Sequence, residues 1–330
     1  MNHKKIAEIA HVSVSTVSKA LAGSAEISAE TADAVRKIAM EMGYFKEKSK
    51  RKRSYTKNSP ALIAVIIPEV LGSYFSACIN SIKQIIEEKG GQTAFYIFDY
   101  NEVKLDKIIN SIILRGSADG MIIFSSPPRK NNQQYNIPMI FCDVFHSVSQ
   151  FDVVSCKKSA VMNEAVRYLK SLGHTSIGFV GDPRTSGSKS GFMEAMRKHG
   201  LQFKEEFSYA PEGRYEKSGL AAAEKILDAK ERPTAFAAAY DEIAIALIHT
   251  LLKNGVRVPE DISVIGVNNI VPSSYSLVPL TTVDVFGTEQ YKTAVDLLFD
   301  KILNEVEVIK HIDIEPKLVV RESTAPPKHS

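Results

Sequence analysis

Residues 4–21, KKIAEIAHVSVSTVSKAL, hold a group of short polar and cationic side chains that could contact another molecule. Apolar residues recur there at helical spacing, which predicts two short helices, 4–10 and 14–21, joined by a tight turn. Asn2 and Ser13 are residue types that cap helix N-termini. The outer face of the second helix is polar, with Ser15, Thr16, Ser18 and Lys19. Hydroxyl groups bond phosphate oxygens and a lysine can reach acceptors on guanine, so a helix-turn-helix that enters a DNA major groove is one interpretation. An ordinary surface hairpin of two helices is the other.

The run HVSVSTVSKAL resembles the N-terminal signature of the LacI family of bacterial transcriptional regulators, roughly V-S-x-x-T-V-S-[RK]-x-L-N. Only the closing Asn differs, because Ala22 stands in its place. The resemblance implies that the second helix binds a double-stranded DNA operator. Its base-reading positions fall on Val14, Ser15 and Lys19. Its positions for contacts with the DNA backbone fall on Ser13, Thr16 and Ser18.

Positive charge is concentrated at the N-terminus. Residues 1–57 contain twelve Lys or Arg against six Asp or Glu, a net charge of +6, whereas the rest of the chain carries −3. A basic end on a mildly acidic body is the pattern expected of a DNA-binding head on a core that does not itself bind DNA.

A third helix follows Ile27 and Ser28, with Val35, Ile38, Ala39 and Met42 as its apolar stripe and Gly43 at its end. The sequence thus predicts a small all-α head over residues 1–45 and a basic linker over 46–60. LacI relatives carry a hinge helix with a leucine at this place, but the linker here has no Leu. Binding to DNA phosphates and simple solvation of the basic run both stay open.

From Ala61 onward, apolar runs alternate with helical patterns, as in an α/β domain with parallel sheets. We expect an effector-binding and dimerisation core over 61–330, built as two doubly wound lobes. Lobe 1 comprises about 61–155 and 288–315, and lobe 2 about 156–287 and 316–326. This arrangement is the periplasmic-binding-protein type I fold, which the family resemblance also implies. Segments such as YLKSLGHTSIGFVG, PEDISVIGVNN and LVVREST resemble family segments.

Ligands of open α/β sheets bind at the carboxyl ends of the strands, here between the lobes. That rule selects Ser73, Tyr74 and Phe75 after the first strand and Ser125 after a later one. It also selects Asp143 after PMIFCD, the segment Asp182–Ser190, Tyr240 with Asp241, and Asn268. Aromatic rings, carboxylates and amides suit a polyhydroxylated ligand, so we expect a small sugar-like effector.

The family resemblance adds pocket positions and several departures from the family pattern. Pocket positions fall on Phe75, Asp143 and Asn268. The family's effector-clamping Arg falls on Ser188, and the usual Asn before Asp241 is Tyr240. An aromatic position falls on Arg214. Because cations are both lost and gained, Arg214, Lys189 or Arg184 could receive an anionic or phosphorylated sugar, although each could equally be a solvated surface residue.

The sequence offers little support for an enzyme. Gly181–Ser190 lacks the spacing of a phosphate-binding loop, GSKSG has Lys189 rather than Ser at its centre, and the eight histidines show no metal-ligand spacing. We therefore expect no catalytic residue, no metal and no cofactor. Cys78, Cys142 and Cys156 have no paired spacing, which indicates a reducing compartment. No apolar run is long enough for a membrane span and no signal-peptide pattern is present, so we expect a cytoplasmic protein that does not bind membranes.

These observations predict a sequence-specific transcriptional regulator, of repressor type, controlled by an effector bound between two lobes. A short recognition helix reads only a few base pairs, so we expect a homodimer on a roughly palindromic operator. The alternatives are a sugar-binding receptor on the same core and a regulator whose core responds to a protein co-effector.

Overall fold

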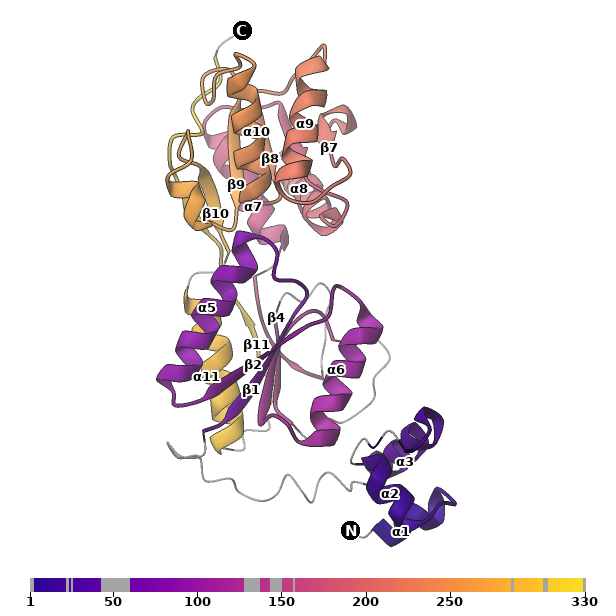
Figure 1. The fold of residues 1–330 in the computed structure, drawn as a ribbon. Helices are drawn as coiled ribbons and strands as arrows, with labels where there is room; N and C mark the ends of the chain where they lie inside the picture. Colours follow the sequence, from indigo (N-terminus) through magenta and orange to yellow (C-terminus); the bar gives the residue numbers. More distant parts are fainter. Residues whose placement is uncertain are drawn as a thin grey trace.

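The computed structural model describes residues 3–21, 24, 26–42, 60–127, 137–142, 150–156, 158–285, 288–304 and 308–328. These residues form a three-helix head and two α/β lobes (Figure 1). The predicted cap Asn2, the effector candidate Asp143 and the basic linker up to Ser59 lie outside the described residues.

The head consists of α1 (His3–Ile9), α2 (Val14–Leu21) and α3 (Ala29–Glu41). Its small core joins all three helices through Ile6, Val17, Ala20, Val35 and Ala39, as the helical spacing predicts. Ile9 is an exception, because it is 54% exposed rather than part of the apolar face. Seven residues make only two turns, and Ile6 and Ala7 already fill the contact with α2 and α3.

Lobe 1 is a parallel six-stranded sheet in the order β11-β5-β4-β3-β1-β2. Helices α5 and α11 cover one face of the sheet and α6 covers the other. Its elements are β1 (Leu62–Ile67), α5 (Ser73–Glu88), β2 (Gln92–Ile97), α6 (Glu102–Arg115), β3 (Gly120–Phe124), β4 (Met139–Cys142), β5 (Asp152–Ser155), α11 (Thr288–Asn304) and β11 (His311–Asp313). The central strands are continuous apolar runs because helices bury both of their faces.

Lobe 2 repeats this plan in the order β12-β10-β9-β8-β6-β7, with β12 antiparallel to β10. The helix pairs α7–α8 and α9–α10 pack around one core that contains Phe179, Phe192 and Phe236. Its elements are α7 (Lys158–Ser171), β6 (Ile177–Val180), α8 (Ser186–Lys198), η1 (Glu205–Phe207), β7 (Ser208–Tyr209), α9 (Glu216–Asp228), β8 (Ala235–Ala238), α10 (Asp241–Lys253), β9 (Ser263–Val267), η2 (Val271–Ser274), β10 (Thr281–Asp284) and β12 (Lys317–Val319).

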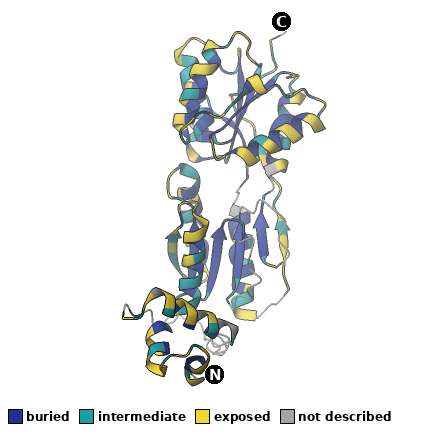
Figure 2. Ribbon diagram, turned by 90° about the vertical axis from the view of Figure 1, so that its right-hand side faces the viewer, coloured by how far each residue is buried: buried dark blue, intermediate teal, exposed yellow. Residues whose placement is uncertain are grey.

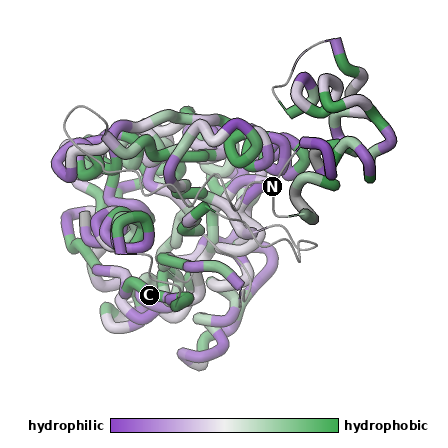
Figure 3. Tube along the Cα trace, turned by 90° about the horizontal axis from the view of Figure 1, so that it is seen from below, coloured by the Kyte–Doolittle hydropathy of each residue, from purple (hydrophilic) through white to green (hydrophobic). Residues whose placement is uncertain are grey.

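Burial follows the layered plan of both lobes. The strands at the centre of each lobe are buried, and the outer faces of the helices are exposed (Figure 2). Along each helix, hydrophobic and hydrophilic residues alternate over short distances (Figure 3), as expected of helices with one face on a sheet.

The chain crosses between the lobes three times: from β5 to α7, from β10 to α11 and from β11 to β12. All three crossings lie at the edge of the sheets formed by β5 and β11 in lobe 1 and by β10 and β12 in lobe 2. We call the side of the two sheets where the chain crosses between the lobes the hinge side.

Three strands do not follow from the sequence pattern. Strand β5 has only Val153 and Val154 between polar residues, β7 is two residues long, and β10 begins with two threonines. These segments are strands because neighbouring strands hydrogen-bond with them. A local hydrophobic pattern does not predict such pairing.

A glycine sets the approach of α9 to α10. A Cβ on Gly219 would lie 2.4 Å from the carbonyl oxygen of Ile243 and 2.8 Å from Cβ of Ala246. The two helices can approach this closely only because residue 219 has no side chain. This contact fixes the N-terminal end of α9, which follows Arg214 and Tyr215.

Candidate functional site: the head helix and the cleft between the lobes

The face of α2 that points away from the head core is free to meet a partner. Val17 and Ala20 are fully buried, whereas Ser15, Ser18 and Lys19 are exposed and Val14 is 42% exposed. Below, the reading face means Ser13, Val14, Ser15, Thr16, Ser18 and Lys19. Ser13 lies just before α2 and the other five predicted DNA-contacting residues lie within it. Thr16 is half-buried, and the remaining residues are exposed.

The N-terminus of α2 is held by a side-chain cap. The backbone N–H of Thr16 donates to Oγ of Ser13 at 2.9 Å, and the two hydroxyl groups lie 2.8 Å apart. Such a cap satisfies a backbone N–H that the helix itself leaves unpaired. Ser13 therefore also orients α2, a role additional to the phosphate contact that its position predicts.

Lys19 forms an ion pair with Glu26, which lies just before α3. Both side chains are exposed, 47% and 69%, so water screens their attraction. Because Lys19 belongs to the reading face, Glu26 competes with any DNA acceptor for the Lys19 ammonium group.

In the cleft, the predicted effector residues lie at the ends of several strands but do not form one cluster. Ser73, Tyr74 and Phe75 begin α5, and the backbone N–H of Ser73 donates to Oε1 of Glu242 in lobe 2 at 3.0 Å. Ser125 follows β3 and donates to the carbonyl of Ser126. Asn268 follows β9 with φ 107°.

The segment Asp182–Ser190 is not the open loop that the strand-end rule suggests. Helix α8 begins at Ser186, so Ser188 and Lys189 are helical, and Ser188 is buried. Asp182 and Thr185 close the preceding turn, with the Asp182 N–H donating to Oγ1 of Thr185 at 2.9 Å. Lys189 pairs with Glu205 and lies over the ring of Phe203, both in lobe 2.

Arg214 is the predicted effector residue with the most contacts across the cleft. Its Nη1 donates to Oδ2 of Asp182 at 2.9 Å, and its Nη2 donates to Oε1 of Glu69 in lobe 1. Nη2 also donates to the hydroxyl oxygens of Tyr215, at 2.9 Å, and of Tyr100, at 3.3 Å. One guanidinium group thus joins a carboxylate of each lobe.

Two tyrosines complete this arrangement. The hydroxyl of Tyr100 donates to Oε1 of Glu69 at 2.6 Å, and the hydroxyl of Tyr215 donates to the same oxygen. Burial, followed by the hydrogen bond to Glu69, raises the pKa of each phenol well above its usual value, so both stay protonated donors. We call the group Glu69, Tyr100, Asp182, Arg214 and Tyr215 the interlobe cluster.

The sequence pattern missed Glu69, Tyr100 and Tyr215. Glu69 follows β1 by two residues and Tyr100 follows β2 by three, so the strand-end rule could have selected both. Tyr215 has φ 52° and ψ −123°, an unusual backbone conformation for a residue with a side chain, and no local pattern predicts it.

Asp241 is structural rather than a ligand contact. It is fully buried and accepts hydrogen bonds from Thr282 Oγ1 at 2.6 Å, Ser273 Oγ at 2.7 Å and the Ile270 N–H at 3.0 Å. Burial raises the pKa of its carboxyl group to about 7, although these three hydrogen bonds act in the opposite direction. Asp241 therefore fastens the segment after β9 to α10 and β10.

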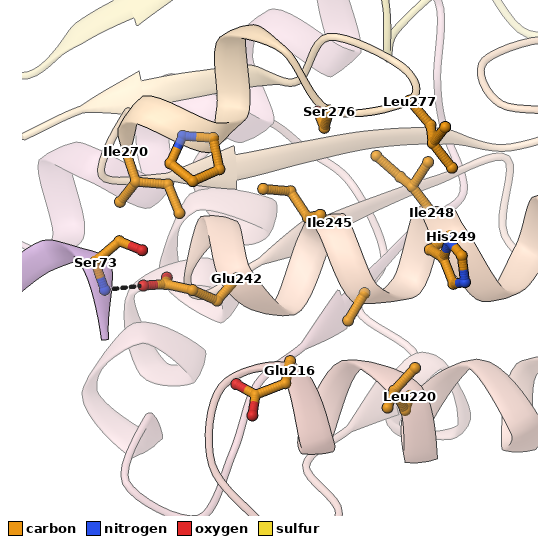
Figure 4. Close-up of a pocket in the computed structure, with 12 residues that line it drawn as sticks. Ser73, Glu216, Leu220, Glu242, Ile245, Ile248, His249, Ile270, Ser276 and Leu277 are labelled. Carbon is orange, nitrogen blue, oxygen red and sulfur yellow. Dashed lines mark hydrogen bonds between the residues drawn. The ribbon is translucent and has the colours of Figure 1, made fainter. Parts of the chain in front are cut away.

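A further pocket lies on the side of α9 and α10 in lobe 2 (Figure 4). Its volume is about 490 Å³ and its lining is mostly apolar, with Leu220, Ile245, Ile270 and Leu277. Ser73 reaches it from lobe 1 through the hydrogen bond to Glu242. Of the predicted effector residues, only Ser73 lines this pocket.

In the described part of the chain, no group of three or more His, Cys, Asp or Glu side chains could hold a metal ion. Among the same residues, none of the helices has the length and apolar character needed to cross a membrane.

Two family models match the chain. A model described as bacterial regulatory proteins, lacI family, matches residues 4–47, and a periplasmic binding protein-like domain matches residues 166–324. The HTH-type transcriptional regulator DegA of Bacillus subtilis strain 168 is 30% identical over 97% of this chain and 97% of that protein. The HTH-type transcriptional repressor PurR of Klebsiella pneumoniae is 28% identical over 98% of this chain and 96% of that protein.

Solved structures show the same architecture. A complex of the transcriptional regulator CelR with cellobiose has a TM-score of 0.67 at 22% identity and covers 98% of this chain and 99% of that chain. A LacI family transcriptional regulator from Enterococcus faecium with bound ribose has a TM-score of 0.69 at 25% identity and covers 80% of this chain and 99% of that chain.

Proposed function

The chain belongs to the LacI family of bacterial regulatory proteins, and from that premise we propose that it binds a specific DNA operator whose affinity is controlled by a small effector between the lobes. It is a DNA-binding transcriptional regulator of repressor type with a periplasmic binding protein-like core.

The observation that carries the DNA-binding proposal is the reading face of α2. Its side chains are exposed, while Val17 and Ala20 anchor the helix in the head core and Ser13 caps its start. A helix held this way can present Ser15 and Lys19 to base edges in a fixed orientation. The positions of Thr16 and Ser18 suit contacts with the DNA backbone.

A sugar-like effector is supported by the polar and aromatic groups at the strand ends. Tyr240 and Tyr215 lie with ring centroids 5.7 Å apart on the lobe 2 side of the cleft, and Ser125 and Asn268 supply hydrogen-bonding groups. Aromatic rings can stack on the C–H faces of a sugar while amides and hydroxyls bond its oxygens. The Enterococcus faecium relative holds ribose, which makes sugars the first ligands to test.

The binding of an anionic sugar by Arg214 stays a prediction, and it requires that an existing ion pair be broken. Because Glu69 and Asp182 already neutralise the guanidinium, such an anion must displace one of them. A neutral sugar needs no such displacement. The comparison of a neutral sugar with its phosphate and its uronate therefore decides the charge of the effector.

We also propose that the regulator acts as a homodimer through the apolar side of lobe 2. LacI-family regulators typically bind operators as dimers. In this chain Leu277 and Leu220, which line the pocket of Figure 4, are 74% and 42% exposed, and Val271 and Tyr275, on η2 and directly after it, are also exposed. A second copy that covers these side chains buries apolar surface and places two heads for a roughly palindromic operator.

The test has two parts. Selection of bound sequences from random double-stranded DNA should give a roughly palindromic site, and thermal melts with sugars, sugar phosphates and uronates should give a ligand that raises the melting temperature and changes operator affinity. A ligand shift without selective DNA binding would favour a sugar-binding receptor. Selective DNA binding with no small-molecule shift would favour control by a protein co-effector.

A further inference from the structure

The strongest unexplained feature of the molecule is the charge arrangement around Arg214. The guanidinium is partly buried and touches carboxylates that come from different lobes: Glu69 follows β1 in lobe 1, and Asp182 follows β6 in lobe 2. An ion pair that only stabilises one lobe would have both partners in that lobe. This one links the two bodies whose separation defines the cleft.

Aromatic rings surround the same guanidinium. The Cζ atom of Arg214 lies 4.4 Å from the ring centroid of Tyr215, 5.7 Å from that of Tyr100 and 5.9 Å from that of Tyr240. The faces of tyrosine rings attract cations through the ring quadrupole. The negative charges of the carboxylates neutralise the cation. Rings and carboxylates together have the composition of a site for a planar organic cation, and an arginine of the chain itself occupies it.

The interlobe cluster and the three chain crossings lie at opposite sides of the two sheets. The three chain crossings lie at the β5–β11 and β10–β12 side of the sheets. Glu69 and Tyr100 follow β1 and β2, at the far side of the lobe 1 sheet, and Asp182 and Arg214 follow β6 and β7, at the far side of the lobe 2 sheet. The cluster therefore fastens the side of the cleft opposite the hinge side.

We propose that Arg214 acts as an internal ligand: its guanidinium fills a cation-binding site made by Glu69, Asp182, Tyr100 and Tyr215 and holds the lobes closed without any effector. This inference concerns the regulation of the proposed effector cleft and rests on the proposed function only for its consequence for DNA binding. An effector then acts on a cleft that is already closed, and it changes the lobe arrangement only through its different affinity for the closed and open forms.

The buried Nε of Arg214 supports this role. Among the described residues it has no hydrogen-bond partner, although both terminal nitrogens of the same group are paired. A buried N–H without a partner is uncommon. Arg214 is therefore held through its two terminal nitrogens, which make the contacts with the carboxylates of the two lobes.

The first measurement is the distance between the lobes in the full-length protein without DNA, from a pair of labels with one on each lobe. Arg214→Ala should increase this distance and broaden its distribution. Glu69→Gln keeps the size of the side chain, removes the lobe 1 charge and should open the cleft in the same direction. Arg257→Ala is the matched control, because it breaks an exposed arginine–carboxylate pair whose two members, Arg257 and Asp261, both lie in lobe 2.

The second measurement is chemical rescue of Arg214→Ala. Ethylguanidinium chloride, at concentrations well below those that denature proteins, should restore the short distance saturably, whereas sodium chloride and urea at equal concentrations should not. The rescue should be absent in Arg214→Ala combined with Glu69→Gln. The thermal melt should follow the same pattern, with ethylguanidinium raising the melting temperature of Arg214→Ala above that in sodium chloride.

Two results would overturn the proposal. One is an unchanged lobe distance in both Arg214→Ala and Glu69→Gln. The other is an opened cleft that ethylguanidinium does not close, which would make Arg214 an ordinary ion pair rather than the occupant of a cation site. If Arg214→Ala does not fold, the Glu69→Gln distance alone decides the closing role. A failure to bind any operator would leave these results intact and would count only against the proposed function.

Discussion

Gly72 of lobe 1 lies directly against the ring of Tyr215 of lobe 2. A Cβ on Gly72 would be 3.0 Å from Cζ and 3.3 Å from the hydroxyl oxygen of Tyr215, and Gly72 has φ 88°. The lobes can approach to this distance because residue 72 has no side chain. The closed cleft therefore depends on a glycine as well as on the charges of the interlobe cluster.

Gly72→Ala should open the cleft and lower the free energy of unfolding. With φ 88° and ψ 152°, Gly72 lies in a region essentially restricted to glycine, which costs a residue with a side chain roughly 1–3 kcal/mol, and the contact with Tyr215 adds to this cost. Gly90→Ala is the control, because Gly90 has φ 76° but nothing within 4 Å of the added Cβ. Denaturant unfolding and the interlobe distance measure the two effects. An equal interlobe distance in the two variants would show that the Tyr215 contact does not limit closure.

Lys19→Ala should reduce discrimination between the selected operator and scrambled DNA by roughly 1–3 kcal/mol, the value of a good base contact. Lys37→Ala removes the same charge from an exposed position on α3 and should weaken binding to both DNAs alike. Fluorescence anisotropy titrations at several salt concentrations measure both. Equal losses of discrimination in the two variants would remove Lys19 from the base-reading group.

Glu26→Gln should strengthen DNA binding. The substitution removes the carboxylate that pairs with the Lys19 ammonium group, and with it a negative charge that would repel the DNA phosphates. Because the pair is exposed, the stability of the head should change by less than about 1 kcal/mol. Titrations with the operator, together with a thermal melt, test both statements, and weaker operator binding would contradict the competition between Glu26 and DNA.

Asp241 should make stability depend on pH. The pKa of its carboxyl group is about 7 in the folded protein and about 4 in an unfolded chain, so between these values only the folded state holds the proton. Stability should therefore fall as pH rises, by roughly 2.5 kcal/mol between pH 5 and pH 7.5. Asp241→Asn cannot titrate and should lose this part of the slope. A difference between wild type and variant that does not change with pH would contradict it.

Asp152→Asn should destabilise lobe 1 strongly. Oδ2 of Asp152 pairs with Nζ of Lys301 at 2.8 Å, and both side chains are more than 90% buried. Loss of one partner from a buried ion pair costs about 3–5 kcal/mol because the other charge stays buried. Glu87→Gln, which breaks the exposed Lys83–Glu87 pair, should cost less than about 0.5 kcal/mol. Denaturant unfolding of both variants provides the comparison, and similar losses would refute the role of burial.

The sequence predicts those parts of this molecule that local patterns determine. Helix α11 and the buried strands β1 and β3 follow from apolar periodicity, and α2 follows from its polar face and the Ser13 cap. Arg214 could be recognised as a cation in the cleft. The strand-end rule selects Asp182 and could have selected Glu69, but it could not pair them with Arg214, because Glu69 is 145 residues away and belongs to the other lobe.

The same limit explains why the sequence pattern did not show the surroundings of two groups of strand-end candidates. Ser188 and Lys189 belong to α8 because the Asp182–Thr185 turn starts the helix five residues before the Gly191–Phe192 pair that the pattern recognises. Asp241 is at a strand end, as the rule requires, but three donors from later segments enclose its carboxylate. Position at a strand end selects candidates, and only the surrounding side chains decide which of them face a ligand.

The three crossings between the lobes also set the order in which a growing chain can finish folding. The head needs only residues 3–42, so it can fold early during synthesis. Lobe 1 lacks α11 and β11 until residue 313 has left the ribosome, and lobe 2 lacks β12 until residue 319. Both sheets are therefore completed almost together, once β11 and β12 have been synthesised. A nascent chain stopped before residue 288 would carry a complete DNA-reading head on two unfinished lobes.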